Sequence, residues 1–350
     1  MSPQTQKALL VTELGKPVVL VTNRLVPQPG PSQVQIRVTV AGANPHDQKA
    51  RDTGLFIAES LPAILTNDVV GKILALGRDV TRFSIGERVV GQASFAPGST
   101  QRGLQEYAVL DADHIAKIPD EFTDDDAATL PTNILASLVA LFDASGFGIP
   151  APWTSAASSF DYKGVTLLII GGGSNCGRYA VQLAALAGIG HIVVVGGDES
   201  GLKSYGATDI IDRHGSAEEV LTRIRKICGD DLLYAYDAIN PPAIQTLGIN
   251  ALSSKKKGKF TRLLPTGPID DSQVQSKEEG YELLNVFGLS HVKSEIGKPF
   301  WEHLPQLLLD RKIKPTEYEA VDGWSAAQVN DVLDRYRDGK KVIKTHFHHV

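Results

Sequence analysis

Cysteine is scarce in this sequence: Cys176 and Cys228 are the two that occur among 350 residues. Two cysteines cannot build a disulfide scaffold, and they are too few for a zinc site with four thiolate ligands. Low cysteine content is typical of a reducing compartment, and the polar first seven residues lack the apolar core of a signal peptide. We therefore expect a cytoplasmic protein.

Long hydrophobic runs and a strong excess of one charge are also missing. No apolar stretch approaches the roughly 18 residues that cross a membrane, so we expect no membrane partner. Thirty-five Lys and Arg residues stand against 40 Asp and Glu residues, a formal net charge of −5 at pH 7. A mildly acidic chain has no electrostatic footprint for nucleic acid, and we interpret the lysine cluster at 255–257 as a solvated turn.

What the sequence does have is 42% hydrophobic residues, enough for two domain cores at about 100 to 200 residues per domain. Apolar residues alternate over 34–40, and Gly, Pro and Asn recur at short intervals as far as residue 98. This pattern predicts a small β-barrel domain. Thr123, followed by three aspartates, predicts a capped helix start.

From residue 165 the pattern alternates between strands and helices. The apolar runs 165–170 and 191–195 are typical of strands buried on both faces. Further strands are expected at 209–212, 234–239 and 260–264, with a capping box at Ser216 and Glu219 opening a helix. Alternation of this kind predicts an α/β fold with a doubly wound parallel sheet.

The C-terminal part returns to a different pattern. It predicts a helix near 301–311 that is interrupted at Pro305, and a second helix that starts at Ser325 and stops at Gly339. The last residues predict a strand that returns to the first domain.

A strand that ends in glycines and leads into a small-residue helix carries the strongest functional signal. Glycines let the backbone approach a ligand, and the helix N-terminus presents free N–H groups to a pyrophosphate. The spacing G-x-x-S-x-x-G differs from G-x-G-x-x-G, so a tight structural turn is the alternative. The residues of this candidate dinucleotide site are Gly171, Gly172, Gly173, Ser174, Asn175, Cys176 and Gly177.

Several segments, in order along the chain, resemble one family. They are AGANPHDQK (41–49), LTNDVVGKILALGRDVTRFSIGERVVG (65–91), RGLQEYAV (102–109), AATLPTNILASLVAL (127–141) and YAYDAI (234–239). The chain resembles the zinc-independent medium-chain dehydrogenases/reductases, especially quinone-oxidoreductase-like proteins and fungal trans-acting enoyl reductases. This resemblance implies a GroES-like β-barrel catalytic domain at 1–129 and 296–350 and a Rossmann domain at 130–295.

The same resemblance implies catalysis without zinc. Zinc-dependent relatives carry Cys at the position of Asn44 and His at the position of Asn67, and an asparagine replaces neither ligand. Asn44 and Thr132 match positions that line the nicotinamide in the family. We therefore expect both residues in the active site and no metal.

Reduction of an activated C=C or carbonyl requires a hydride from a nicotinamide and a group that stabilises negative charge on oxygen. Lys49 matches the family lysine close to the nicotinamide, and we expect its ammonium to stabilise that charge. The alternative is a surface lysine paired with Asp47 or Asp52.

The end of the second Rossmann strand bears on the choice of cofactor. Gly196 and Gly197 occupy the positions where NAD enzymes usually carry an acid for the ribose. Lys203 and Arg213 are nearby bases for a 2′-phosphate, whereas the acidic pair 198–199 would repel it. We predict NADPH, with NADH as the alternative. The remaining cofactor residues implied by the resemblance are Pro265, Thr266, Gly267 and Lys341.

The sequence therefore predicts a metal-independent, NADPH-dependent oxidoreductase that transfers hydride to an enone, an enoyl thioester or a quinone. A metal-free alcohol/carbonyl oxidoreductase and a non-catalytic NADPH-binding protein are the alternatives. The expected partner is a small-molecule substrate, free or tethered to a carrier, and the expected state is a monomer or a homodimer.

Overall fold

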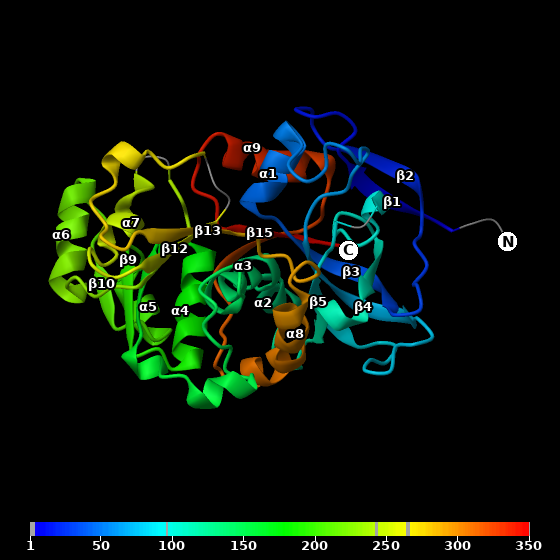
Figure 1. Ribbon diagram of the computed structural model, residues 1–350. Helices are drawn as coiled ribbons and strands as arrows, with labels where there is room; N and C mark the ends of the chain where they lie inside the picture. Colours follow the sequence, from blue (N-terminus) through cyan, green and yellow to red (C-terminus); the bar gives the residue numbers. More distant parts are fainter. Residues whose placement is uncertain (1–3, 96, 242–243, 264–266, 350) are drawn as a thin grey trace. The chain divides into compact units, whose positions relative to one another are not determined.

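The computed structural model describes residues 4–95, 97–241, 244–263 and 267–349. The chain divides into two compact units. The first unit comprises residues 1–132, 289–311 and 315–350, and the second comprises residues 133–288 and 312–314. Figure 1 labels the helices and strands of both units.

The first unit is built on a seven-stranded sheet. Its strand order is β14-β15-β3-β4-β5-β7, with β6 pairing β3 off this path, and β1 and β2 form a separate two-stranded sheet. The strands are β1 (Thr5–Leu10), β2 (Val19–Leu25), β3 (Gln33–Gly42), β4 (Asp68–Leu76), β5 (Arg88–Gln92), β6 (Tyr107–Asp111), β7 (Ile115–Lys117), β14 (Tyr318–Val321) and β15 (Lys344–His348). Val34, Ile36, Val38 and Val40 of β3 are all buried, which confirms the strand predicted from their alternation.

The α-helices described in this unit are α1 (Pro45–Thr53), α2 (Asp124–Ala128), α8 (Ser294–Leu309) and α9 (Ala326–Arg337). The predicted caps are confirmed, because Thr123 accepts a hydrogen bond from the N–H of Asp126 and Ser325 accepts one from the N–H of Gln328. The interruption predicted at Pro305 is wrong. Helix α8 runs through that residue, because it buries Phe300, Trp301 and other apolar side chains, and this burial outweighs one lost backbone hydrogen bond.

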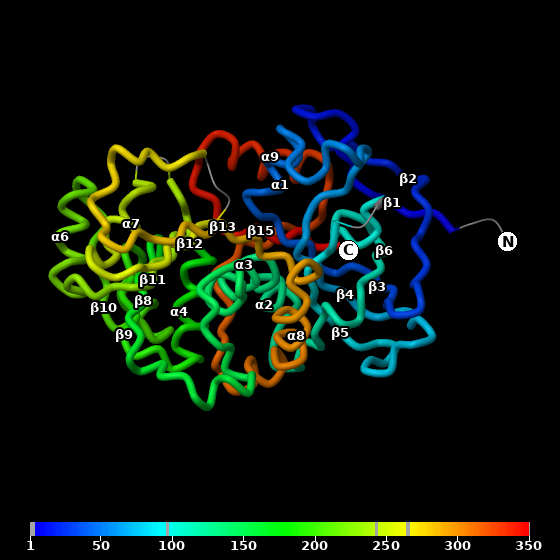
Figure 2. Tube along the Cα trace, viewed as in Figure 1, coloured from blue at the N-terminus to red at the C-terminus, as the bar shows by residue number. Residues whose placement is uncertain are grey.

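The C-terminal strand β15 joins the sheet built by the first part of the chain. It pairs antiparallel with β3, so that Phe347 lies opposite Ala41. Figure 2 shows this red segment beside the blue strand β3. The predicted return of the C-terminus to the first domain is confirmed, and it carries Lys344 into the unit that holds Asn44.

The second unit contains a six-stranded sheet in which every pair is parallel. Its order, β10-β9-β8-β11-β12-β13, is the doubly wound arrangement 3-2-1-4-5-6. The strands are β8 (Thr166–Ile170), β9 (His191–Val195), β10 (Asp209–Ile211), β11 (Tyr234–Asp237), β12 (Gly258–Leu263) and β13 (Tyr281–Val286). The helices are α3 (Pro131–Phe142), α4 (Asn175–Ala187), α5 (Glu199–Ser204), α6 (Ala217–Cys228) and α7 (Leu247–Ala251).

Helices cover both faces of this parallel sheet. In Figure 1, α4 and α5 lie on one side of the strands, and α6 and α7 lie on the other. Strands β8 and β9 are almost entirely buried, as the continuous apolar runs predicted. Their carboxyl ends, where α/β sheets bind ligands, lead directly into the glycine loops described below.

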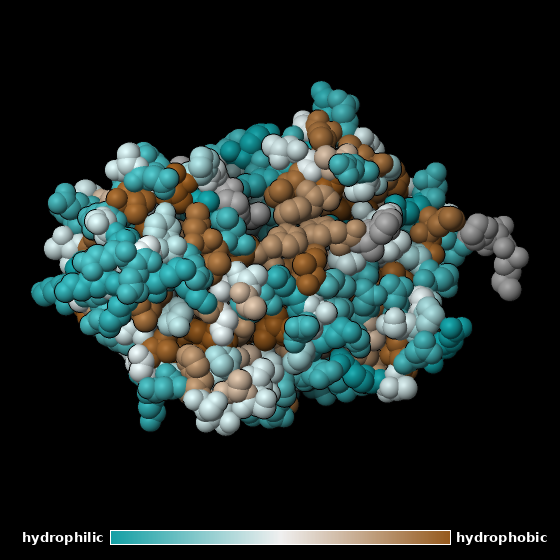
Figure 3. Space-filling view, in the orientation of Figure 1, coloured by the Kyte–Doolittle hydropathy of each residue, from teal (hydrophilic) through white to brown (hydrophobic). Residues whose placement is uncertain are grey.

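Hydrophobic side chains are not confined to the cores. Figure 3 shows brown side chains among the polar ones on the face in view, and Leu20, Leu25 and Phe56 are exposed by 53%, 60% and 39%. Among the described helices, none combines the length and the apolar character that crossing a membrane requires.

Candidate functional site

The glycine loop joins the end of β8 to the start of α4 in the second unit. Ser174 caps the helix, because its Oγ accepts a hydrogen bond of 3.0 Å from the N–H of Gly177. A Cβ on Gly177 would lie 2.2 Å from the carbonyl oxygen of Gly171, so no larger residue fits there without a shift of the backbone. The loop therefore folds tightly back on the first turn of the helix.

A second glycine turn packs against this loop. Gly197 follows β9 with φ at +103°, and a Cβ there would lie 2.8 Å from the backbone nitrogen of Gly173. The two turns thus approach each other through backbone alone, next to the N-terminus of α4. A helix N-terminus bordered by side-chain-free backbone fits a pyrophosphate, so the residues present are suited to a dinucleotide cofactor.

A pocket of about 290 Å³ lies beside the second glycine turn. The stem of Arg213 packs closely against Gly196, since a Cβ on that glycine would lie 2.9 Å from Cδ of Arg213. The pocket is lined by Gly196, Gly197, Glu199, Ile210, Ile211, Asp212, Arg213 and His214. Gly196, Gly197 and Arg213 therefore lie together, as the sequence-based cofactor prediction requires.

The two acids that the sequence placed near a 2′-phosphate have other partners. Asp198 caps α5 and accepts a hydrogen bond of 2.6 Å from the N–H of Gly201. Glu199 forms a 2.6 Å ion pair with Lys203. Lys203 is therefore engaged with Glu199 and does not line the pocket, whereas Arg213 does.

The other expected cofactor residues fall in different parts of the chain. Pro265 and Thr266 lie outside the described residues. The carbonyl oxygen of Gly267 accepts a 3.0 Å hydrogen bond from Arg262 at the end of β12. Lys341 is an exposed residue of the first unit, just before β15.

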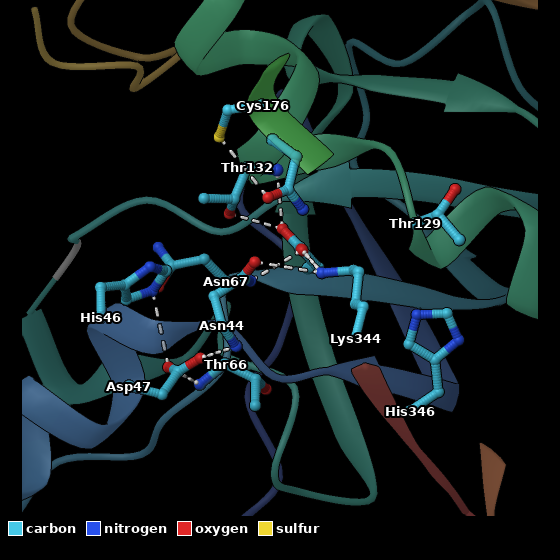
Figure 4. A network of polar contacts seen from close by, with 12 residues as sticks. Asn44, His46, Asp47, Thr66, Asn67, Thr129, Thr132, Cys176, Lys344 and His346 are labelled. Carbon is cyan, nitrogen blue, oxygen red and sulfur yellow. Dashed lines mark hydrogen bonds and ion pairs between the residues drawn. The ribbon is translucent and has the colours of Figure 1, made fainter. Parts of the chain in front are cut away.

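In the first unit, Asn44 and Thr132 meet at the carboxylate of Asp68. Asn44 Nδ2 donates to Asp68 Oδ2 at 2.8 Å, while the N–H and hydroxyl of Thr132 donate to Oδ1 at 2.8 and 2.5 Å. Figure 4 shows that Asn44, Thr132 and Lys344 point toward one another. The structure thus brings together two of the three residues predicted to be catalytic, around an acid that the sequence reasoning missed.

Lys344 closes this network. Its ammonium forms an ion pair with Asp68 and donates to Asn44 Oδ1 at 3.1 Å. The side chains of Lys344 and Asp68 are 2% and 0% exposed. Burial alone would raise the pKa of Asp68, but the charge of Lys344 and the hydrogen bonds from Asn44, Lys344 and Thr132 lower it. We refer to Asn44, Asp68, Thr132 and Lys344 as the Asp68 network.

Lys49, the third residue predicted to be catalytic, is exposed on α1. Neither acid that could have held it as a surface ion pair does so. The carboxylate of Asp47 is buried and accepts 2.8 Å hydrogen bonds from the N–H groups of Asn44 and Thr66. Asp52 pairs with Arg51 instead. Among the described residues, the ammonium of Lys49 has no ion-pair partner.

Asn67 occupies the position where zinc-dependent relatives place a histidine. Its Nδ2 donates to the carbonyl oxygen of Ala93 at 3.0 Å, and its Oδ1 contacts His46 Nε2 at 3.0 Å. The same oxygen accepts a hydrogen bond from Arg102. Over the described ranges, no group of three or more His, Cys, Asp or Glu side chains could hold a metal ion.

Sequence reasoning missed Asp68, Lys344 and Arg102. Asp68 lies in the segment 65–91 that carried the family resemblance, where a charge at the start of an apolar run was the available signal. Lys344 has no such signal, because 276 residues separate it from its partner.

Comparisons with known proteins agree with this architecture. The alcohol dehydrogenase GroES-like domain matches residues 30–120. The trans-enoyl reductase himH of Aspergillus japonicus is 32% identical over 321 residues, which cover 89% of this chain and 88% of that protein. This chain is a medium-chain dehydrogenase/reductase. Its membership makes it an oxidoreductase and confirms the predicted family.

Solved structures confirm the fold class of this medium-chain dehydrogenase/reductase, a GroES-like domain with a Rossmann domain. The CurK enoyl reductase superposes with a TM-score of 0.75 at 20% identity, covering 99% of both chains. A mycobacterial protein solved in complex with NADPH superposes with a TM-score of 0.74 at 20% identity, covering 98% of this chain and 100% of that chain. At these identities the likeness establishes the fold alone.

Proposed function

We propose that this oxidoreductase uses NADPH, without a metal, to reduce an activated C=C bond in an enone, an enoyl thioester or a quinone. The second unit would bind the cofactor, and the first unit would supply the groups that act on the substrate. The observation that carries the proposal is the glycine loop at the N-terminus of α4, next to the pocket lined by Gly196, Gly197 and Arg213. The names of the fungal relatives support reduction of an enoyl group over that of a simple ketone.

The bound cofactor would supply the hydride, and the chain's own residues would do the rest. The glycine loop would receive the pyrophosphate, and Arg213 would meet the 2′-phosphate. The Asp68 network fixes the amide of Asn44 and the hydroxyl of Thr132 in single orientations. Groups that are held in place before substrate binds need no reorganisation during the reaction, which is a main source of catalysis.

Lys49 would stabilise the negative charge that develops on the substrate oxygen. Its ammonium is exposed, and the neighbouring acids Asp47 and Asp52 are engaged with other groups. A cation that meets the oxygen as it becomes negative binds the transition state better than the neutral substrate, and this difference raises the rate.

The test is a substrate panel. The purified protein is incubated with NADPH and with enones, quinones, enoyl thioesters and aldehydes, and NADPH consumption is followed by absorbance. We expect turnover with the conjugated substrates. Turnover with aldehydes alone would favour a carbonyl oxidoreductase, and tight NADPH binding without any turnover would favour a non-catalytic protein.

Elemental analysis tests the absence of a metal from the reaction. Asn44 Oδ1 accepts a hydrogen bond from Lys344, and Asn67 Oδ1 is shared by Arg102 and His46, so neither amide is available as a ligand. We expect no stoichiometric zinc and no loss of activity with a chelator. One tightly held zinc per chain, with activity lost on chelation, would overturn this part of the proposal.

A further inference from the structure

Arg102 is a charged residue that is buried without an ion pair to an acid among the described residues. The residue is 4% exposed. Its Nη1 donates to Asn67 Oδ1, and its guanidinium carbon lies 4.9 Å from the centre of the Phe95 ring. Across the described part of the chain, its guanidinium makes no other hydrogen bond and no ion pair.

Burying a guanidinium without an ion-paired acid destabilises the folded state, so a functional reason for it is expected. A guanidinium offers five N–H donors, and no Arg102 nitrogen is among the buried, unpartnered polar atoms of the described residues, so the donors that Asn67 does not accept still reach solvent. Burial lowers the pKa of Arg102 to about 10, against the opposing effect of the charge of Asp47, so the side chain remains a cation at neutral pH. The remaining donors are available to a ligand.

Asp47 balances the charge of Arg102 without occupying these donors. Its two oxygens accept hydrogen bonds from the N–H groups of Asn44 and Thr66, and no ion pair joins it to Arg102 among the described residues. A site with balanced charge and free donors fits a carbonyl oxygen that is neutral when it binds and gains negative charge during the reaction.

We propose that Arg102 binds the carbonyl oxygen of the substrate and stabilises the enolate. This inference rests on the proposed reduction of a conjugated C=C bond. Asn67 holds the guanidinium in place from one side and the Phe95 ring supports its face. His46, which contacts the same oxygen of Asn67, lies three residues from Lys49 on α1 and shares a helix face with it.

The electron count of this step is simple. A bound NADPH would supply the hydride and be oxidised to NADP⁺. The hydride would form a C–H bond at the β carbon, and the C=C π pair would become the new double bond between the α carbon and the carbonyl carbon. The carbonyl π pair moves onto oxygen, which accepts hydrogen bonds from the guanidinium of Arg102. A proton from water then forms a bond to the α carbon, and the carbonyl is restored.

The test compares Arg102 with Arg82, a matched arginine of the same unit. Arg82 also lies over a phenylalanine ring, with its guanidinium carbon 5.2 Å from the centre of Phe83, but its donors are used by Glu302 and by two carbonyl oxygens. We expect Arg102→Gln to lower kcat about 10²-fold on the best substrate of the panel, while Arg82→Gln changes it less than about twofold. Arg102→Lys keeps the charge but not the planar fork, and we expect an intermediate loss.

A binding measurement separates this inference from the proposed reaction. 4-Nitrophenolate mimics an enolate oxygen and reports binding by its absorbance, with NADP⁺ present and no turnover. We expect the affinity to fall at least tenfold in Arg102→Gln and to stay unchanged in Arg82→Gln. If Arg102→Gln does not fold, the same measurement is made on Arg102→Lys, for which we expect at least a fivefold loss.

The two failures are distinguishable. Phenolate binding that depends on Arg102, in a protein that turns over no member of the panel, would support the oxygen site and overturn the proposed reaction. Wild-type kcat and wild-type phenolate affinity in the folded Arg102 variants would overturn the oxygen site and leave the reaction standing. A wild-type protein that binds no phenolate would also overturn the site.

Discussion

The glycine loop of the second unit and the Asp68 network of the first are built in opposite ways. The loop uses seven consecutive residues, and its shape depends on where a Cβ is missing. The network uses side chains at positions 44, 68, 132 and 344, and its shape depends on charge and hydrogen bonds in a buried site. The glycine loop can be recognised from a local sequence pattern. The Asp68 network forms only when distant segments have folded together.

This difference predicts different responses to mutation. A buried polar network stabilises when every member is satisfied, and it becomes a liability when one partner is removed. The glycine loop depends mainly on the close approach of backbone, with Ser174 as a capping side chain, so the changes at its glycines that damage it are those that add atoms. The four predictions below probe this difference, from the largest expected effect to the smallest.

Lys344→Met should give the largest effect. It would leave the carboxylate of Asp68 buried without its cation, and breaking a buried ion pair in this way costs about 3–5 kcal/mol. The free energy of unfolding, measured in urea, should fall by this amount, and any residual turnover should fall with it because Asn44 loses the donor to its Oδ1.

The matched control is the double variant Asp68→Asn/Lys344→Met, which removes both charges and keeps an amide oxygen for Thr132. It should regain most of the lost stability. If Lys344→Met alone costs less than about 1 kcal/mol, the pair behaves like an exposed ion pair and the contrast with the loop fails.

The contrast between local and long-range contacts also explains how much of the fold could be predicted from the sequence. The capped helix starts at Thr123, Ser216 and Ser325 were predictable because each depends on residues three apart. The buried strands at 166–170 and 191–195 were predictable from their unbroken apolar runs. Local rules sufficed wherever the determining contacts were local.

The candidate site was predictable in part, for the same reason. The glycine loop and Arg213 follow directly from strand ends, but Asp68 became recognisable as the centre of a network only from its partners. The continuous helix through Pro305 depends on apolar side chains that pack in the fold, and no local rule contains that packing. Arg102 is similar, because its lack of an acidic partner is a property of the three-dimensional site.

Lys49→Ala should lower turnover about 10²- to 10³-fold, equivalent to roughly 3–4 kcal/mol, if its ammonium stabilises charge on the substrate oxygen. NADPH affinity should hardly change, because the proposed pyrophosphate site lies at residues 171–177 and not at Lys49. Steady-state kinetics and a fluorescence titration of NADPH check the two parts.

Lys72→Ala, on the exposed side of β4, is the control and should be neutral. Wild-type turnover in Lys49→Ala would remove Lys49 from the site. The double variant Lys49→Ala/Arg102→Gln tests whether both cations act on the same oxygen. If they do, the losses of turnover in the two single variants should not add in the double variant.

Substitutions in the glycine loop should separate folding from binding. Gly177→Ala forces a Cβ to within 2.2 Å of the carbonyl oxygen of Gly171, and overpacking of this kind costs about 1–3 kcal/mol of stability. Gly173→Ala places its Cβ 3.4 Å from Gly197 Cα, an ordinary contact, so stability should change little. It should still weaken NADPH binding about tenfold, by covering backbone that the cofactor approaches. Equal NADPH affinity in Gly173→Ala and the wild type would place the pyrophosphate elsewhere.

The preference for NADPH over NADH is the smallest expected effect, and it tests the pocket beside the second glycine turn. Arg213 lines the pocket beside Gly196 and Gly197, while Lys203 is paired with Glu199. We expect the wild type to bind NADPH at least tenfold more tightly than NADH, about 1.4 kcal/mol, as measured by fluorescence titration.

Arg213→Gln should bring the two affinities together by weakening NADPH binding alone, because NADH has no 2′-phosphate to lose. Lys203→Gln should leave the ratio within about twofold of the wild type. Loss of the preference in Lys203→Gln, with Arg213→Gln unchanged, would move the phosphate to α5. Equal affinities in the wild type would contradict a contact between Arg213 and a 2′-phosphate. They would favour NADH, because the pocket is also lined by the acids Glu199 and Asp212.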